Sequence, residues 1–213
     1  MIMQDSVQEL TGVRSDEPTA EEIRLSGGLL VEDWPHARQV MRLSIQLFEA
    51  TQPLHGYGKH ALRLLERAAF LHNTGMMVEA RRHHKHSYRL IKETPLPDFS
   101  DKQRHEIACI ARYHRRALPS TDHEEYASLS SSARKRVSAL SALLRIADAL
   151  DYDHDGRVLK VAADSAHCTE KHWTLRLWVR PLADLDVELE HAQEKADLFE
   201  KIFDRKLHFV THD

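Results

Sequence analysis

Apolar residues recur at helical spacing from about residue 33 to residue 152, which is typical of helices with one buried face. Asp33 is placed to cap the first helix, with Pro35 inside its first turn, and Gly75 is predicted to stop the second. Five helices are predicted in this region. Two begin at the capping residues Asp33 and Ser100, and the other three cover residues 59–73, 84–93 and 131–151. The pattern therefore predicts a mainly α helical bundle.

The pattern changes after Gly156. The segments RVLKVAAD, WTLRLWVR and LHFVTH are typical of strands, whereas VELEHAQEKADLFEKIFDRK is typical of one helix. A small β-β-α-β subdomain is therefore predicted for residues 156–213. Residues 1–32 are polar and are predicted to form an arm with at most one short helix, TAEEIRL, capped by Thr19. The predicted bundle between them covers residues 33–155.

Composition narrows the functional classes. No apolar run in the 213 residues approaches the roughly 18 that a membrane span needs, and the first residues lack the apolar stretch of a signal peptide. Only two cysteines are present, as expected of a reducing cytoplasm without a disulfide framework. A net charge of -3 does not favour general nucleic-acid binding. We expect a cytoplasmic protein without membrane contacts.

Histidine is unusually frequent, with 16 residues, and several occupy the apolar stripes of the predicted helices. His36, His72, His114 and Asp148 each stand on such a stripe and should point inward, toward one another. A single inward histidine is more often a hydrogen-bonded core residue than a ligand. A buried carboxylate, however, needs a partner or a metal, so the pattern predicts a shared polar site.

Basic residues gather near these positions, in ARRHHKHSYR (residues 80–89) and RYHRRALP (residues 112–119). Guanidinium forks can clamp phosphate oxygens, and histidine can move protons. The candidates for ligand binding are Lys85, His86, Arg115, Arg116 and Arg145. His84 and His114 are candidate catalytic acids if the site is active. The alternative is a solvated basic face, which applies most directly to Arg81 and Arg82.

Blocks of this sequence resemble a known family in the same order: LLERAAFLHNTG, HHKHSYRLIKETPLPDFS, IARYHRRALP and LSALLRIADALD. They follow an HD-domain pattern. More closely, they resemble the C-terminal helical domain of the Ppx/GppA family of exopolyphosphatases and guanosine pentaphosphate phosphatases. The resemblance runs from about Trp34 through Asp151. The predicted β-β-α-β tail is similar to the last domain of that family.

In that family, hydrolysis belongs to N-terminal actin-like domains with glycine-rich phosphate loops. These 213 residues contain no such loop, so the family's exopolyphosphatase activity is not expected of them. Asn73 also stands where an active HD hydrolase has Asp. An amide oxygen offers a hard cation only a dipole. His36, His72 and Asp148 remain as ligands, with Asn73 a weak fourth, for a weakly held Mn, Fe, Ni or Zn ion.

These residues leave several functions open. The first is a regulatory module that binds polyphosphate or a phosphorylated nucleotide in a degenerate HD pocket and acts on a catalytic protein partner. The second is an active metal-dependent phosphohydrolase that uses His36, His72 and Asp148. The third is a scaffold that uses neither site. The family resemblance also implies a homodimer.

Overall fold

The computed structural model describes residues 17–212, so the first half of the predicted arm lies outside the described residues. The described part of the arm contains α2 (Ala20–Ser26), which is the predicted short helix. Thr19 caps it, because its hydroxyl accepts a hydrogen bond from the Glu22 amide and Glu22 reaches back to Thr19. The predicted cap is therefore confirmed.

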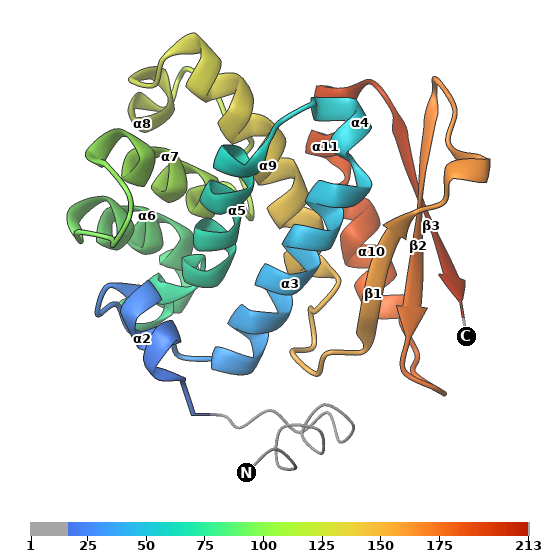
Figure 1. Ribbon diagram of the computed structural model, residues 1–213, viewed down its shortest axis with the longest axis horizontal. Coiled ribbons are helices and arrows are strands. Elements are labelled where there is room, and N and C mark those ends of the chain that lie inside the picture. The colour runs from blue at the N-terminus through green and yellow to red at the C-terminus, as the bar shows by residue number, and fades with distance from the viewer. Residues whose placement is uncertain (1–16, 213) are drawn as a thin grey trace.

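The bundle is mainly α, as predicted (Figure 1). Asp33 caps the first long helix by accepting a hydrogen bond from the His36 amide at 3.0 Å, and Ser100 caps a later helix in a capping box. The long helices are α3 (Trp34–Ala50), α5 (Lys59–Leu71), α6 (His83–Glu93), α7 (Asp101–Arg112) and α9 (Ser131–Ala149). Short turns of helix join them: α4 (Gln52–His55), η1 (Thr74–Met77), η2 (Ala80–Arg82) and α8 (Glu124–Ala127).

The C-terminal unit contains a three-stranded sheet in the order β1-β2-β3. Strand β2 pairs antiparallel with β1 and parallel with β3, so the link between β2 and β3 crosses over through helices, as parallel strands require. The elements are β1 (Val158–Ala163), η3 (Ser165–His167), β2 (His172–Val179), α10 (Asp186–Lys195), α11 (Asp197–Phe203) and β3 (Lys206–His212). The predicted single helix was wrong in one respect, because it breaks into α10 and α11 at Ala196.

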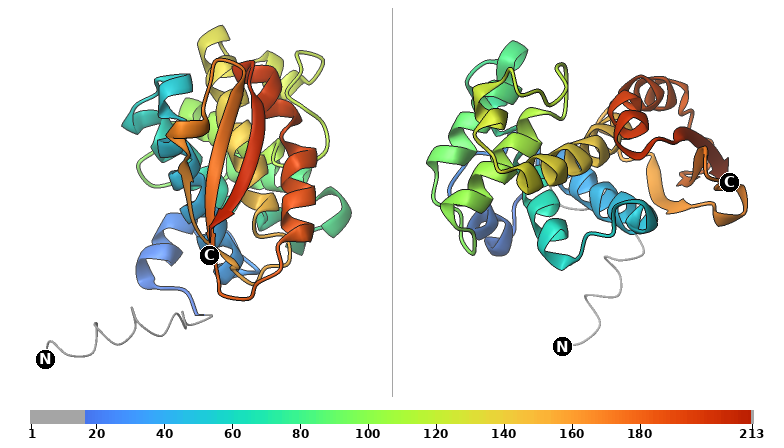
Figure 2. Two further views of the ribbon diagram at one scale, coloured as in Figure 1. Left: turned by 90° about the vertical axis from the view of Figure 1, so that its right-hand side faces the viewer. Right: turned by 90° about the horizontal axis from the view of Figure 1, so that it is seen from above.

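One hydrophobic core runs through the bundle and the C-terminal unit. Helices α10 and α11 pack on α9, and β1 lies along α3 (Figure 2). The Gln39 side chain of α3 donates to the Val158 carbonyl at 2.7 Å, and Gln46 accepts from the Val161 amide at 2.8 Å. Within the part of the chain that the structure describes, no helix has the length and apolar character needed to cross a membrane.

Gly75 has a different role from the predicted one. Helix α5 ends at Leu71, with His72 as its C-terminal cap, and Gly75 lies in the following 3-10 turn without a positive φ. A Cβ at Gly75 would lie 2.2 Å from the His83 carbonyl oxygen and 2.4 Å from the Ser87 amide nitrogen. The glycine is therefore needed because the turn after α5 presses directly on the backbone of α6.

We expect Gly75→Ala to destabilise the protein by about 2 to 4 kcal/mol, because two backbone segments must separate to admit one methyl group. Gly58→Ala is the matched control, since a Cβ there meets nothing within 4 Å. Urea unfolding followed by circular dichroism measures both. Equal, small effects of the two substitutions would contradict this account of Gly75.

A second prediction concerns Glu22, which fixes α2 to the bundle. Arg38 donates to the Glu22 carboxylate at 2.9 Å, and this bond holds the pKa of Glu22 at about 2, below its usual 4.5. A lowered pKa stabilises the fold above the unfolded value, and the contribution is lost as pH falls from about 4.5 to 2. We expect it to reach about 2 to 3 kcal/mol. Glu22→Gln should lack this pH-dependent part in urea titrations between pH 6 and pH 2.5.

Candidate metal centre

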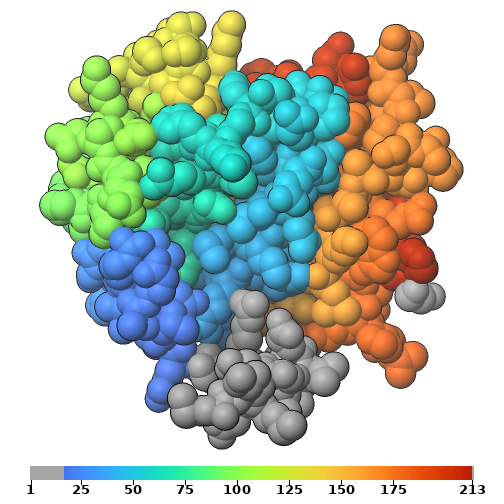
Figure 3. Space-filling view, viewed as in Figure 1, coloured from blue at the N-terminus to red at the C-terminus, as the bar shows by residue number. Residues whose placement is uncertain are grey.

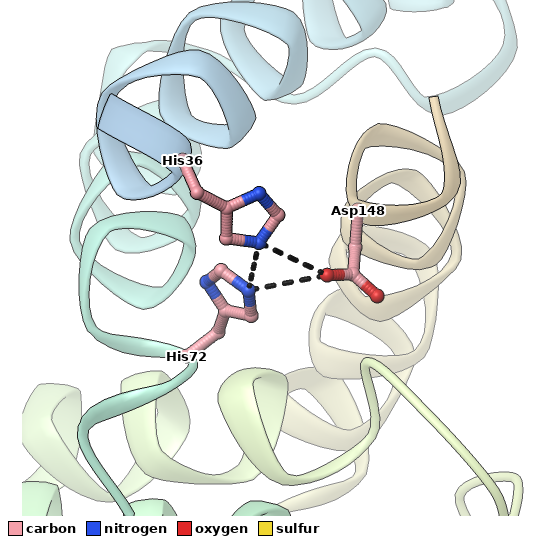
Figure 4. A group of neighbouring side chains, drawn as sticks. All are labelled: His36, His72 and Asp148. Carbon is pink, nitrogen blue, oxygen red and sulfur yellow. Dashed lines mark hydrogen bonds and ion pairs between the residues drawn. The ribbon is translucent and has the colours of Figure 1, made fainter. Parts of the chain in front are cut away.

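Two histidines and an aspartate from three helices meet inside the bundle. His36 lies at the start of α3, His72 directly follows α5, and Asp148 lies near the end of α9 (Figure 4). The two Nε2 atoms are 3.3 Å apart, and Asp148 Oδ1 lies 3.2 Å from His72 Nε2 and 3.5 Å from His36 Nε2. The ligand atoms all lie within 4.8 Å of one another, so one ion could contact all three.

The surrounding structure fixes both imidazole rings. His36 Nδ1 donates to Asp151 Oδ2 at 2.8 Å, and His72 Nδ1 donates to the Ala69 carbonyl at 2.7 Å. Both acceptors lack a proton to give, so each Nδ1 carries the hydrogen and each Nε2 faces the cluster. His154 stacks on His36 with ring centroids 3.6 Å apart. This support from Asp151 and His154 was not predicted from the sequence.

The cluster already attracts a positive charge. Burial alone would lower the pKa of His36, but hydrogen bonds and charges from Asp148 and Asp151 outweigh burial and raise it to about 9. His72 is fully buried, and burial lowers its pKa. In the metal-free protein, a proton on His36 Nε2 can therefore be shared with His72 and Asp148.

The donor set suits a transition metal, because imidazole nitrogens outnumber the single carboxylate oxygen. A further observation supports a fit: Asn73 Oδ1 is buried and has no hydrogen-bond partner among the described residues. Buried amide oxygens are normally paired. The residues present therefore fit a divalent transition metal held by His36, His72 and Asp148.

Lys195 is the feature that sequence reasoning missed most clearly. It is the last residue of α10, and its Nζ lies 2.6 Å from Asp148 Oδ2. Burial favours the neutral form of Asp148, but Lys195 and the two histidines outweigh it and hold the pKa of Asp148 well below its usual value. The cluster thus has a built-in cation on the carboxylate that would ligate a metal.

A second histidine pair adjoins the first. His114 and His72 meet edge to face with ring centroids 5.0 Å apart, and His114 Nε2 lies 3.0 Å from His83 Nε2. Burial lowers the pKa of both His83 and His114 and so favours the neutral form of each ring. The structure thus places His114 beside the cluster, as expected.

From the sequence, His84 was named as a candidate catalytic acid and its neighbour His83 was not. His84 is also buried, but its ring lies 6.1 Å from that of His83, and its Nδ1 has no hydrogen-bond partner among residues 17–212. His83, the first residue of α6, is the one that contacts His114. Adjacent histidines in HHKH give no sequence signal that separates them.

The basic residues predicted to bind ligand are dispersed. Arg115 lies next to the histidines, with NH1 3.3 Å from His83 Nδ1. Arg145 is buried and donates to Asp197 at 3.0 Å, so it fixes α11. His86 pairs with Glu79 at 3.3 Å. Lys85 and Arg116 complete the predicted set, and both are exposed.

The fold and the cluster define a mainly α domain with a two-histidine, one-aspartate centre and a small sheet. A model of the family described as "Ppx/GppA phosphatase, domain III" matches residues 30–203. The chain therefore belongs to the Ppx/GppA phosphatase family, as its sequence blocks predicted.

Curated relatives agree with this assignment. A guanosine-5'-triphosphate,3'-diphosphate pyrophosphatase of Aliivibrio fischeri is 27% identical over 183 residues, which are 82% of this chain and 35% of that protein. One of Vibrio cholerae is 33% identical over 140 residues, which are 63% of this chain and 27% of that protein. The chain thus spans about a third of the length of the curated relatives it matches.

We expect a divalent transition metal to bind weakly, and His72→Ala to weaken binding at least about 100-fold by removing a ligand. His60→Ala is the matched control, because His60 lies exposed on the same helix, α5. Calorimetric titration with Zn²⁺ and Mn²⁺ measures both. Loss of binding in His60→Ala, or retention in His72→Ala, would place the metal elsewhere.

Two further substitutions should tighten metal binding. Asn73→Asp adds a charged oxygen, and Lys195→Met removes a cation that lies 2.6 Å from a ligating carboxylate. Each change should raise metal affinity by about tenfold or more. The same titration, with protein stability checked by thermal unfolding, measures the gain. Unchanged affinity in both variants would show that the charge near Asp148 does not limit metal binding.

Proposed function

We propose that the chain is a phosphate-binding regulatory module that recognises polyphosphate or a phosphorylated nucleotide without hydrolysing it. The observation that carries this proposal is the ion pair between Lys195 and Asp148, with Nζ and Oδ2 2.6 Å apart. An ammonium group in this position repels a metal and attracts a phosphate. The degenerate residue Asn73 acts in the same direction, because it removes one negative charge from the centre.

In this proposal an extended anion contacts cationic side chains near the centre. Lys195 contacts Asp148, and Arg115 lies beside His83, which contacts His114 next to the cluster. Arg116 follows Arg115 in the chain and Lys85 lies on α6, and both are exposed. The histidines themselves are buried, so phosphate oxygens would accept hydrogen bonds from Lys195 and Arg115 at the rim.

The names of the relatives suggest which nucleotide is bound. These relatives are pyrophosphatases of guanosine-5'-triphosphate,3'-diphosphate, so this nucleotide is the first ligand we propose. Binding here would act on a catalytic protein partner or on actin-like domains of the kind found in the family. A cytoplasmic homodimer is part of the same proposal.

A second candidate function is a metal-dependent phosphohydrolase, which the convergence of His36, His72 and Asp148 within 4.8 Å favours. A bound metal would polarise a phosphoryl oxygen and acidify a bound water. In this reading, Arg115 would neutralise the phosphate. His114, paired with His83, or His84, with its unpartnered Nδ1, would protonate the leaving group.

Calorimetry with guanosine-5'-triphosphate,3'-diphosphate and polyphosphate, with a chelator present, tests the proposed module. We expect saturable binding that Lys195→Met weakens at least about tenfold. Lys201→Met is the matched control, because Lys201 is exposed on α11. No binding of either anion would refute the module.

Phosphate release from the same ligands, assayed with Mn²⁺, Ni²⁺, Zn²⁺ and Fe²⁺, separates the two candidates. The module predicts no product with any metal. Turnover that disappears with chelator and in His72→Ala would instead establish the phosphohydrolase.

A further inference from the structure

A hollow separate from the candidate metal centre lies between α2, α3, α5 and the segment that precedes α7. It shares no residue with that centre. The surfaces of α2, α3 and α5 meet on the face shown in Figure 3. The cavity volume is ≈ 360 Å³, within the usual range for small-molecule sites. Its lining consists of Arg24, Leu25, Met41, Ile45, Arg63, Glu66, Arg67, Phe70, Asp98 and Phe99.

Two arginines in this hollow form no ion pair with a carboxylate of the described residues. Arg63 and Arg67 lie one turn apart on α5, and neither makes an ion pair with any described residue. Their guanidinium carbons lie 5.3 and 5.0 Å from the centre of the Phe99 ring. Arg24 differs, because it pairs with Glu21 and Asp98.

Arg67 is buried, although it is a cation. Among the described residues, its side chain donates one hydrogen bond, from NH1 to the Leu25 carbonyl at 2.7 Å, which leaves other N–H donors for a ligand. Burial and the charges of Arg24 and Arg63 lower the pKa of Arg67 to about 10 and outweigh the opposing charges of Asp98 and Glu21. A buried guanidinium without an ion-pair partner among residues 17–212 is stabilised when an anion binds beside it.

Glu66 adds an acceptor to the same hollow. It is half-buried, lies three residues after Arg63 on α5, and makes no hydrogen bond or ion pair with any residue in the described range. Burial raises its pKa. A ligand that reaches Arg63 and Arg67 therefore also meets an unpaired carboxylate, which would accept a hydrogen bond from an ammonium group.

The remaining lining is apolar, with Met41 and Ile45 one turn apart on α3 and Phe70 on α5. A polyphosphate would leave this surface uncovered and would be repelled by Glu66 and Asp98. An apolar α-amino acid matches the arginines, Glu66 and the apolar lining at once, because it carries a carboxylate, an ammonium group and an apolar side chain.

We infer that this hollow binds a free apolar α-amino acid. Its carboxylate contacts Arg63 and Arg67, its ammonium group contacts Glu66, and its side chain covers Met41, Ile45 and Phe70. This site is independent of the phosphate-binding centre, so a failure of either proposal leaves the other standing.

Calorimetry on the full chain with leucine, methionine and phenylalanine tests the inference. We expect saturable binding of at least one of them. Its des-amino acid and its amide should each bind at least about tenfold more weakly, because one charged contact is lost in each. Arg63→Gln should weaken binding of all carboxylates at least about tenfold. Lys59→Gln, on the same helix and outside the hollow, should leave binding unchanged.

Glu66→Gln distinguishes a direct contact with the ligand from a purely structural role of Glu66. It should reduce the preference for the amino acid over its des-amino analogue to near unity while the protein keeps its melting temperature. Absence of saturable binding by all three amino acids, or a preference that Glu66→Gln leaves intact, would overturn the inference.

Discussion

The carboxylate of Asp148 is the group on which the arrangement of this protein depends. Its side chain is 15% exposed, and a carboxylate so far from water is costly unless it is paired. The pairing groups come from α3, α5 and α10: His36 and His72 reach Oδ1, and Lys195 reaches Oδ2. One buried charge thereby ties the start of the bundle, its second helix and the C-terminal unit to α9.

Several cations compete for the carboxylate of Asp148. A proton on His36, the ammonium of Lys195 and a divalent metal are all stabilised by Asp148, and each weakens the others by charge repulsion. Asn73 removes a charge that would have favoured the metal. These competing charges are the physical basis of the proposal that this domain binds anions although it keeps three candidate metal ligands.

Local packing near the end of α5 supports the centre. The Ser87 hydroxyl donates to the His72 carbonyl at 2.7 Å and accepts from the Gly75 amide at 2.9 Å. This contact holds the turn after α5 against α6, and it needs the close backbone approach at Gly75. The position of His72 against α6 thus depends on Ser87 and Gly75 as well as on the candidate metal ligands.

The sequence by itself determined the long helices of the bundle, the N-terminal caps at Thr19, Asp33 and Ser100, and the inward direction of His36, His72, His114 and Asp148, because apolar periodicity and caps are local properties of the chain. Tertiary structure alone decided which groups complete the site. Lys195 reaches Asp148 and Asp197 reaches Arg145 because the chain turns between α10 and α11, where periodicity predicted one continuous helix. The contacts of Asp151 with His36 and of His83 with His114 likewise depend on how the helices pack. Contacts between residues far apart in the chain depend on how elements pack in three dimensions, and one sequence carries no local signal of that packing.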